Sequence, residues 1–325
     1  MKTSVAVIYG GNSSEYDISV LSGRYTASMI DREKYDVYEV LLRYADWNVV
    51  EWDNDKMTVK GPVEKGDFSF NGVKFDIAFP MIHGVPGENG LLQGYFEMLG
   101  VPCASCSSFV NTVAFSKYSC KSYLRGAGIQ MADEVVLRKG DDYNVSEIIA
   151  KLGLPLFVKP ADGGSSFGIT KVKIEQDLDA AIKYAFEEGD VIIIESYVPG
   201  REMTQGVYTD GKQVITLPIT EIISYNEYFD YEAKYLGKSD EVCPARINAN
   251  ERKLISEVSE KIFRILGCSG LIRIDYILNE RGLFFLEINT APGMTKMSLV
   301  PKMVAVSGQS MTEFLTGIIE ANLHK

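Results

Sequence analysis

Two apolar segments near the carboxyl end of the chain constrain the fold most strongly. Residues 271–278 (LIRIDYIL) and residues 286–293 (LEINTAPG) are rich in β-branched or aromatic residues, and a short turn at residues 279–282 ends in Gly282 between them. This pattern predicts an antiparallel hairpin. Each segment carries polar residues two positions apart, so each polar pair lies on one face of its strand.

The loop length of this hairpin decides whether the two polar pairs meet. A four-residue loop would separate them. A three-residue loop, residues 280–282, with Gly282 left-handed in a bulge, would place Asp275 opposite Glu287 and Arg273 opposite Asn289. We prefer the three-residue loop, because glycine is the residue that such a turn requires.

This arrangement gathers two carboxylates, an amide oxygen and a guanidinium on one patch. Mg²⁺ prefers oxygen ligands and often shares them with substrate phosphates. The patch is therefore a candidate magnesium site. The hairpin alone leaves open an ordinary ion pair on a sheet face.

The length, composition and net charge of the chain narrow the class of protein. The chain has 325 residues, 46% of them hydrophobic, and a net charge of −11, which predicts two or three domains and argues against a surface for nucleic acids or anionic membranes. No signal peptide or membrane span is expected, and the five scattered cysteines read as reduced thiols of a cytoplasmic protein, although Cys103 and Cys106 have C-x-x-C spacing. Two histidines exclude a site built from several histidines.

The first hundred residues alternate strand and helix patterns. Residues 5–9 form a strand pattern, followed by GGNSSE and a helical pattern, and residues 75–82 form another strand pattern that ends at His83. Alternation predicts a parallel sheet with ligand groups at the carboxyl ends of its strands, where Glu15 and His83 lie. Glu15 could instead complement a helix dipole, and a lone histidine is more often structural.

A glycine-rich segment follows a strand pattern in the middle of the chain. Residues 154–160 end in Lys159 and Pro160, residues 161–168 read ADGGSSFG, and residues 169–174 alternate as in a strand. A P-loop would enter a helix. This segment therefore predicts a hairpin tip whose N–H groups can bind phosphates, with a plain surface loop as the alternative. Residues 219–240 are rich in aromatics and are expected to form a lid, with a loop anchored by aromatic packing as the alternative.

Taken in order, these motifs form a known pattern. They are GGNSSE, HGVPGENG, SKYSCK, VKPADGGSSFG, ESYVPGRE, FDYEAKY, CPA, RID and LEINTAPGMTKMSLVP. The chain resembles the D-alanine–D-alanine ligases of the ATP-grasp superfamily from residue 4 to about residue 305. The resemblance implies a three-domain α/β fold: an N-terminal parallel-sheet domain (1–105), a central α+β domain with the glycine-rich hairpin loop (106–194), and a C-terminal α+β domain with a mainly antiparallel sheet, metal site and lid (195–325).

The resemblance also implies roles for individual residues. The implied ligands of two Mg²⁺ ions, with Mn²⁺ as an alternative, are Asp275, Glu287 and Asn289. The implied ATP contacts are Lys117, Lys159, Ser166, Glu195, Val198 and Glu202. The first D-alanine ammonium would be held by Glu15, linked through Ser165 to Tyr235. Groups around the second D-alanine and the γ-phosphate would be Lys234, Ser298 and Leu299. The implied oxyanion donors are Arg273 and the N–H of Gly293, with His83 near the substrates.

The implied activity is ATP-dependent joining of two D-alanines through an acyl phosphate, for peptidoglycan precursor synthesis, by a homodimer in the cytoplasm. Ser116, Cys103 and Asn89 depart from the usual family residues. Two alternatives stay open: a ligase that makes D-alanyl-D-lactate, against which Tyr235 argues, and a catalytically silent nucleotide-binding module. The intact hairpin residues argue against the second.

Overall fold

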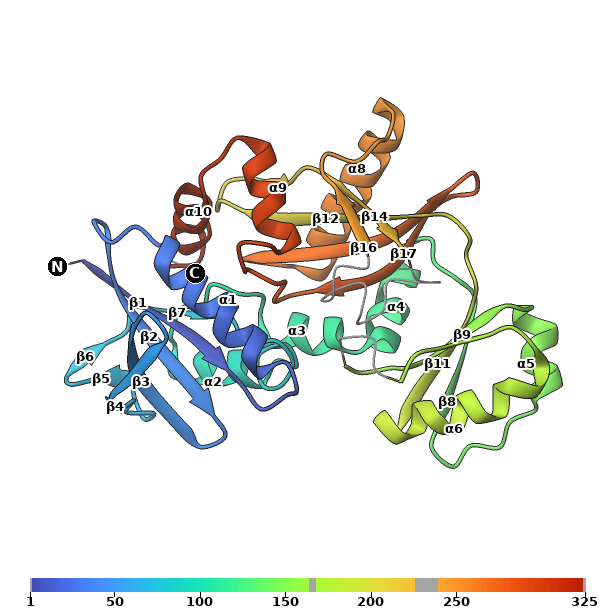
Figure 1. Cartoon of the computed structure of the whole chain (residues 1–325), viewed down its shortest axis with the longest axis horizontal. Coiled ribbons are helices and arrows are strands. Elements are labelled where there is room, and N and C mark those ends of the chain that lie inside the picture. Colours follow the sequence, from blue (N-terminus) through green and yellow to red (C-terminus); the bar gives the residue numbers. More distant parts are fainter. Residues whose placement is uncertain (1, 164–167, 226–238, 324–325) are drawn as a thin grey trace.

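Three larger sheets lie along the length of the molecule, with the C-terminal sheet between the N-terminal sheet and the central one, and β5 and β6 form a fourth, two-stranded sheet (Figure 1). The structure is a computed structural model, which describes residues 2–163, 168–225 and 239–323. The parallel strands lie in the N-terminal sheet, whereas the central and C-terminal sheets are antiparallel. The predicted fold class is confirmed.

The N-terminal sheet has the order β4-β3-β2-β1-β7, with β1 parallel to both of its neighbours. Residues 5–9 of β1 are fully buried, as expected for a parallel strand covered on both faces. Because β1 and β7 run in the same direction, the segments that contain Glu15 and His83 emerge at the same edge. The elements are β1 (Thr3–Gly10), α1 (Tyr16–Met29), β2 (Tyr35–Arg43), β3 (Asp46–Asp53), β4 (Lys56–Pro62), β5 (Ser69–Phe70), β6 (Val73–Lys74), β7 (Ile77–Pro80) and α2 (Leu91–Leu99).

The central sheet has the order β10-β9-β11-β8, and α5 and α6 supply its apolar core. Val158 of β9 pairs with Thr170 of β10, so a strand follows the glycine-rich segment, and the predicted hairpin is confirmed against a P-loop. The elements of this part are α3 (Ser108–Phe115), α4 (Lys117–Gly126), β8 (Glu134–Arg138), α5 (Val145–Leu152), β9 (Leu156–Pro160), β10 (Thr170–Val172), a 3₁₀ turn (Glu175–Asp177), α6 (Leu178–Glu188) and β11 (Val191–Ser196).

The C-terminal sheet has the order β15-β14-β12-β16-β17, and β13 adds to β12. Its long helix α8 begins at a capping box formed by Asn248 and Glu251 and ends at the left-handed Gly267. The elements are β12 (Arg201–Thr209), β13 (Val214–Thr216), β14 (Thr220–Ser224), β15 (Ser239–Val242), α8 (Ala249–Leu266), β16 (Leu271–Asn279), β17 (Gly282–Asn289), α9 (Leu299–Ser307) and α10 (Met311–Leu323).

The register of the β16–β17 hairpin is the predicted one, but the predicted loop is wrong. Asp275 pairs with Glu287 and Arg273 pairs with Asn289. Asn279 pairs with Gly282, so the loop has two residues, and the extra residue is Leu286, in a bulge where Asp275 and Tyr276 pair with residues 287 and 285. The bulge, and not the turn, moves the two polar pairs opposite each other.

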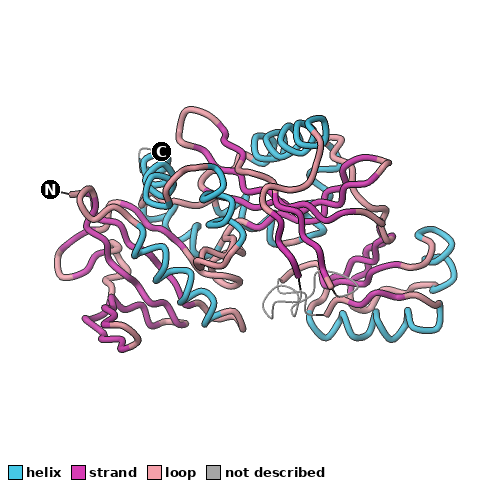
Figure 2. The backbone as a smooth tube through the Cα atoms, turned by 45° about the horizontal axis from the view of Figure 1, so that its top comes forward, coloured by secondary structure: helices cyan, strands magenta, loops and turns pink. Residues whose placement is uncertain are grey.

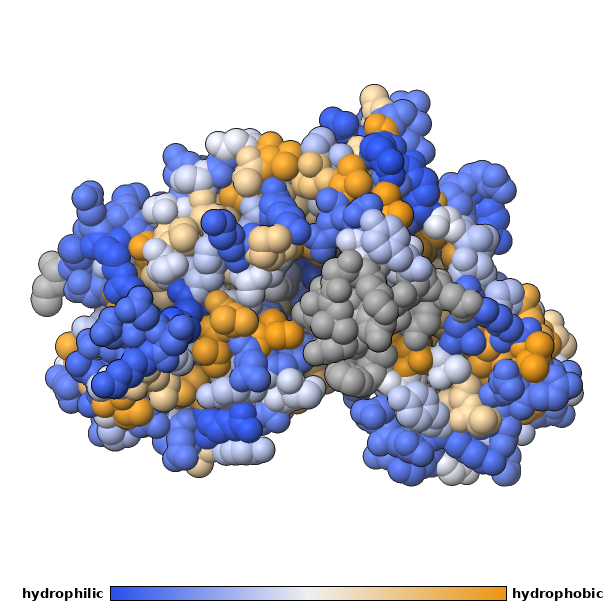
Figure 3. Space-filling model, in the orientation of Figure 1, coloured by the Kyte–Doolittle hydropathy of each residue, from blue (hydrophilic) through white to orange (hydrophobic). Residues whose placement is uncertain are grey.

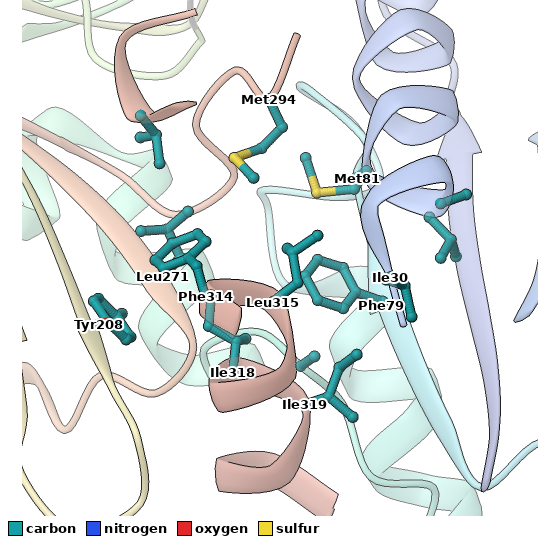
Figure 4. Close-up of a cluster of buried hydrophobic side chains, with 14 of the residues drawn as sticks. Ile30, Phe79, Met81, Tyr208, Leu271, Met294, Phe314, Leu315, Ile318 and Ile319 are labelled. Atoms are coloured by element: carbon teal, nitrogen blue, oxygen red, sulfur yellow. The ribbon is translucent and has the colours of Figure 1, made fainter. Parts of the chain in front are cut away.

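Helix α10 packs against both the N-terminal and the C-terminal sheet in one apolar core. Phe314, Leu315, Ile318 and Ile319 of this helix are fully buried, and Figure 4 shows them between Tyr208 and Leu271 on one side and Phe79 on the other. Figure 2 shows the same helix beside the N-terminal sheet. The N-terminal and C-terminal sheets are therefore held together by packing, and not only by the chain between them.

Helices α3 and α4 share an apolar core with the C-terminal sheet. Val110, Ala114 and Leu124 belong to the cluster that contains Ile262 of α8 and Phe285 of β17. The boundaries at residues 105/106 and 194/195 stay a prediction. Within the described residues, no helix is long and apolar enough to cross a membrane.

Candidate active site

A cavity of about 370 Å³ lies between the N-terminal edge, helix α4 and the β16–β17 hairpin. Figure 3 shows hydrophobic side chains gathered on the face over the start of α1, and Ile18 and Leu21 of that helix belong to the cavity wall. The predicted site residues in the wall are Glu15, His83, Lys117, Arg273, Glu287, Asn289, Gly293, Ser298 and Leu299.

His83 is fixed by a chain of hydrogen bonds. Its Nδ1 lies 2.8 Å from the Ala291 carbonyl oxygen, so Nδ1 carries the proton, and its Nε2 accepts from the Ser22 hydroxyl at 3.0 Å. Ser22 Oγ also accepts the Met294 N–H at 3.3 Å. Burial lowers the pKa of His83 despite the neighbouring Glu15, which agrees with a neutral ring. The ring therefore connects the N-terminal edge to the segment after β17.

Glu15 lies at the N-cap of α1, where the chain leaves the edge of the N-terminal sheet. The turn at Gly84 approaches it so closely that a Cβ on residue 84 would lie 3.5 Å from Glu15 Oε2 and 2.8 Å from Ser13 Oγ. Gly84 also has a φ of +72°, so glycine is required there on two grounds. Ser13 Oγ donates to the His83 carbonyl oxygen at 2.8 Å, which holds the two turns together.

Glu88 is a further carboxyl group in this wall. Its Oε2 accepts the Gly84 N–H at 2.6 Å. Burial raises its pKa to about 8, and the nearby charge of Glu15 adds to the rise. At pH 7 Glu88 is therefore mostly protonated.

The polar face of the hairpin is organised around a bidentate ion pair. Arg273 Nε and Nη2 donate to the two oxygens of Asp275 at 3.0 and 2.8 Å, and the Thr204 hydroxyl donates to Asp275 as well. Arg273, Glu287 and Asn289 line the cavity, whereas Asp275 is buried beneath them. The guanidinium is thus held in place by a buried carboxylate.

The oxygen donors on this face fit Mg²⁺ by their chemistry. Glu287 and Asp275 are directly opposite on paired strands, and Asn289 is two residues beyond Glu287 on the same face. Across the described part of the chain, no group of three or more His, Cys, Asp or Glu side chains is placed to hold a metal. A magnesium site here would therefore depend on the Asn289 amide and on oxygens of the substrate as well.

Two lysines of the central part were predicted to contact ATP, and of these Lys117 lines the cavity. Lys117 is the first residue of α4, and its Nζ donates to the Gly163 carbonyl oxygen at 2.8 Å and lies 3.9 Å from Glu287. Lys159, on β9, forms an ion pair with Glu195 of β11 at 2.5 Å. Burial, and then the charge of Lys121, lower the pKa of Lys159 to about 7.

The segment after β17 closes the cavity on its other side. Ser298 is the N-cap of α9, and its Oγ accepts the Thr295 N–H at 3.0 Å. A Cβ on Gly293 would lie 3.0 Å from Ser298 Oγ, so the backbone of residue 293 is packed directly against this cap. Gly293 and Arg273 both line the cavity.

Comparison with known proteins gives the family. The sequence matches the D-ala D-ala ligase N-terminus over residues 4–106 and the D-ala D-ala ligase C-terminus over residues 123–320. It is 46% identical over 325 residues to a D-alanine–D-alanine ligase of Phocaeicola vulgatus, covering 98% of this chain and 99% of the relative. The chain belongs to the D-alanine–D-alanine ligase family.

Solved structures agree with the assignment to this ligase family. The fold matches the VanG D-Ala:D-Ser ligase of Enterococcus faecalis with a TM-score of 0.87 at 32% identity, covering 99% of this chain and all of the other. It matches a D-alanine–D-alanine ligase of Bacillus anthracis complexed with ATP with a TM-score of 0.79 at 29% identity, covering 99% and 97%. The resemblance inferred from the motifs is confirmed.

Besides Lys159, Glu195 and Asp275, the predicted residues of this ligase outside the cavity wall fall into two groups. Glu202 is at the start of β12, and Val198 is buried in the linker before it, beside Phe284. Ser165, Ser166, Lys234 and Tyr235 lie outside the described residues, as does most of the predicted lid. Their roles, and those of the other site residues, stay predictions.

Sequence reasoning missed several residues of the wall, among them Glu88, Glu241, Thr295 and Met297. Glu88 stands in the HGVPGENG motif, and Thr295 and Met297 stand in LEINTAPGMTKMSLVP, so the motifs themselves were the available signal. Glu241 forms an ion pair with Lys302 of α9 at 2.7 Å. A pairing between residues 61 positions apart has no local sequence signal.

Proposed function

We propose that this chain joins two D-alanines in an ATP-dependent reaction and releases ADP and phosphate. The γ-phosphoryl group of ATP is transferred to the carboxylate of the first D-alanine, and the amine of the second attacks the acyl phosphate. Phosphate then leaves as the peptide bond forms. The product would serve peptidoglycan precursor synthesis.

The observation that carries this proposal is the composition of the cavity. A carboxylate and a histidine from the N-terminal edge, Glu15 and His83, face a lysine from α4 and a guanidinium from the hairpin in one cavity. An amino acid has one cationic and one anionic end. The cavity offers a partner for each, and the lysine side leads toward the glycine-rich hairpin.

The chain's own groups suit the first step. Lys117 and Lys159 supply positive charge for the phosphates, and phosphoryl transfer depends mainly on alignment and charge neutralisation. Asp275, Glu287 and Asn289 would hold Mg²⁺, which supplies further neutralisation of phosphate charge when bound. Glu195, Val198 and Glu202 would contact the nucleoside.

The second step creates an oxyanion on the former carboxyl carbon. Arg273, held by Asp275, and the N–H of Gly293 would donate to that oxygen. Losing one such donor typically costs about 10²–10³ in rate. Glu15 would hold the ammonium group of the first D-alanine, while the neutral His83 keeps the 291–294 segment in position.

The test is an assay of ADP release by the full chain with Mg²⁺ and ATP, with D-alanine, D-alanine plus D-lactate, D-alanine plus D-serine, or no acceptor. D-serine is included because the matched Enterococcus faecalis protein is a D-Ala:D-Ser ligase. ADP release that requires D-alanine and yields the dipeptide by mass spectrometry is expected. Nucleotide binding without turnover would indicate a silent nucleotide-binding module instead.

The assembly and location of the protein are also part of this proposal. We propose a homodimer in the cytoplasm, where ATP and the precursors of the cell wall are available. The family relationship supports both statements. Light scattering after size-exclusion chromatography tests the first, and a mass near 36 kDa, that of one chain, would refute it.

A further inference from the structure

Lys121 is a buried cation that none of the steps above uses. It lies one helical turn after Lys117 on α4, so both lysines project from the same face of the helix. The side chain of Lys121 is 1% exposed. Its Nζ contacts Glu195 Oε1 and lies 3.5 Å from Glu134 Oε2.

The two carboxylates that Lys121 contacts are directly opposite each other. Glu195 of β11 pairs with Glu134 of β8 in the antiparallel ladder, and both side chains are about 5% exposed. Like charges at opposite positions destabilise a sheet. Lys121 lies between them, and Arg125 Nη2 lies 2.6 Å from the other oxygen of Glu134, Oε1.

Lys159 approaches the same carboxylate from the other side. It pairs with Ile193, so it lies on the same face as Glu195, two residues further along β11. Its Nζ is 2.5 Å from Glu195 Oε2. Each oxygen of Glu195 therefore holds one lysine: Lys121 on Oε1 and Lys159 on Oε2.

We propose that Lys121 is a positioning residue for ATP binding, which fixes Glu195 and so leaves Lys159 able to exchange its carboxylate partner for a phosphate of the nucleotide. The inference rests on the proposed function, in which Lys159 and Glu195 contact ATP. Lys121 itself is too deeply buried to touch the nucleotide. It acts through Glu195.

The physical reason is competition for Lys159. With both lysines present, the single charge of Glu195 is shared between two lysine side chains, so Glu195 holds Lys159 less strongly than it would hold Lys159 alone. Without Lys121, Glu195 and Glu134 lose the cation between them, and the whole charge of Glu195 acts on Lys159. A phosphate must then displace Lys159 from a stronger ion pair, so nucleotide affinity falls.

The experiment compares Lys121→Met with the wild-type full chain. We expect the KM for ATP, and the dissociation constant of ADP with Mg²⁺ measured calorimetrically, to rise roughly tenfold, the change that about 1.4 kcal/mol of additional ion-pair strength at Lys159 would cause. The KM for D-alanine and the kcat at saturating ATP should stay within about threefold. Unchanged nucleotide affinity, or a loss of kcat alone, would overturn the proposal.

Two further variants separate positioning from charge balance. Lys121→Met with Glu134→Gln removes one charge of each sign, so it should fold even if the single variant does not, and it should keep the raised KM for ATP. Recovery of wild-type affinity in that double variant would mean that Lys121 only offsets Glu134, which would overturn the proposal. Arg125→Met is the matched control, because Arg125 contacts Glu134 but not Glu195, and its KM for ATP should equal that of the wild type.

A failure of this inference is distinguishable from a failure of the proposed function. ADP release by the wild-type chain with D-alanine tests the function. Only the ratio of nucleotide affinities between variant and wild type tests the role of Lys121, and ADP binding gives that ratio without any turnover.

Discussion

Gly293 offers a direct test of the proposed oxyanion site, because alanine at this position creates one defined contact. The new Cβ would lie 3.0 Å from Ser298 Oγ, closer than most real Cβ contacts, and 3.5 Å from Ser298 Cβ. Gly293 is not among the residues with positive φ, so alanine suits the backbone itself. Either Ser298 or the backbone of residue 293 must therefore move by a few tenths of an ångström.

The hydrogen bonds decide which of the two moves. A shift of Ser298 weakens its contacts with the Thr295 N–H at 3.0 Å and with Thr295 Oγ1 at 2.8 Å, each worth about 0.5–1.5 kcal/mol. A shift of the 293 backbone strains mainly the long bond from Met294 N–H to Ser22, at 3.3 Å. The backbone should yield, carrying the 293 N–H away from the oxyanion. We expect kcat to fall about 10²–10³-fold, which is about 2.7–4 kcal/mol, with less than about 1 kcal/mol lost in unfolding free energy.

The assay is a double-mutant cycle in kcat for ADP release, with thermal unfolding measured in parallel. In the Ser298→Ala background the Oγ atom is gone, and the nearest atom is Cβ at 3.5 Å, an ordinary contact. Gly293→Ala should then cost less than about tenfold relative to Ser298→Ala alone, so the two sites should be coupled. An equal loss in both backgrounds would refute the clash with Ser298 as the cause.

Three further predictions concern the metal face, the histidine and a lysine. Glu287→Gln should abolish ADP release without loss of stability, because a neutral amide is a poorer Mg²⁺ ligand; near-normal release by a folded variant would contradict this. Ser22→Ala should lower the unfolding free energy in urea by about 1–3 kcal/mol, since it leaves His83 Nε2 and the Met294 N–H without their partner; an unchanged value would contradict it. The pKa of Lys159 is lowered to about 7, so at pH 8 roughly a tenth of the molecules carry the proton. A polyphosphate favours the protonated form, so ADP binding at pH 8 should take up a proton; equal heats in two buffers of different ionisation enthalpy would exclude this.

In the β16–β17 hairpin, the pairing of the polar residues was predictable from the sequence, whereas the position of the bulge was not. Polar residues two positions apart fix which side chains share a face, and that sufficed to place Asp275 opposite Glu287. The position of the extra residue was not predictable in the same way. A two-residue loop with a bulge at Leu286 and a three-residue loop with a bulge at Gly282 give the same pairing at the polar end, and an ordinary leucine carries no signal for a bulge.

The buried charges were less accessible to sequence reasoning. In the sequence, Lys121 is an ordinary polar residue within a helical pattern. Its partner Glu134 is 13 residues away along the chain, and its partner Glu195 is 74 residues away. Helix periodicity shows only that Lys121 shares a face with Lys117. That this face meets two opposed carboxylates follows from the pairing of β8 with β11, which the local pattern of neither strand specifies.

The segment after β17 explains why the N-terminal sheet would matter for the chemistry as well as for binding. The Thr290 hydroxyl donates to the buried Asn111 of α3 at 2.6 Å, and the Ala291 carbonyl oxygen accepts from His83 at the N-terminal edge. Gly293 follows two residues later, so groups from two other parts of the chain hold the segment that carries its N–H. Preorganised hydrogen-bond donors stabilise the charge of a transition state effectively, because they need not reorient during the reaction. A substitution that loosens the N-terminal edge should therefore lower kcat through Gly293, even where it leaves Glu15 and the binding of the first D-alanine unchanged.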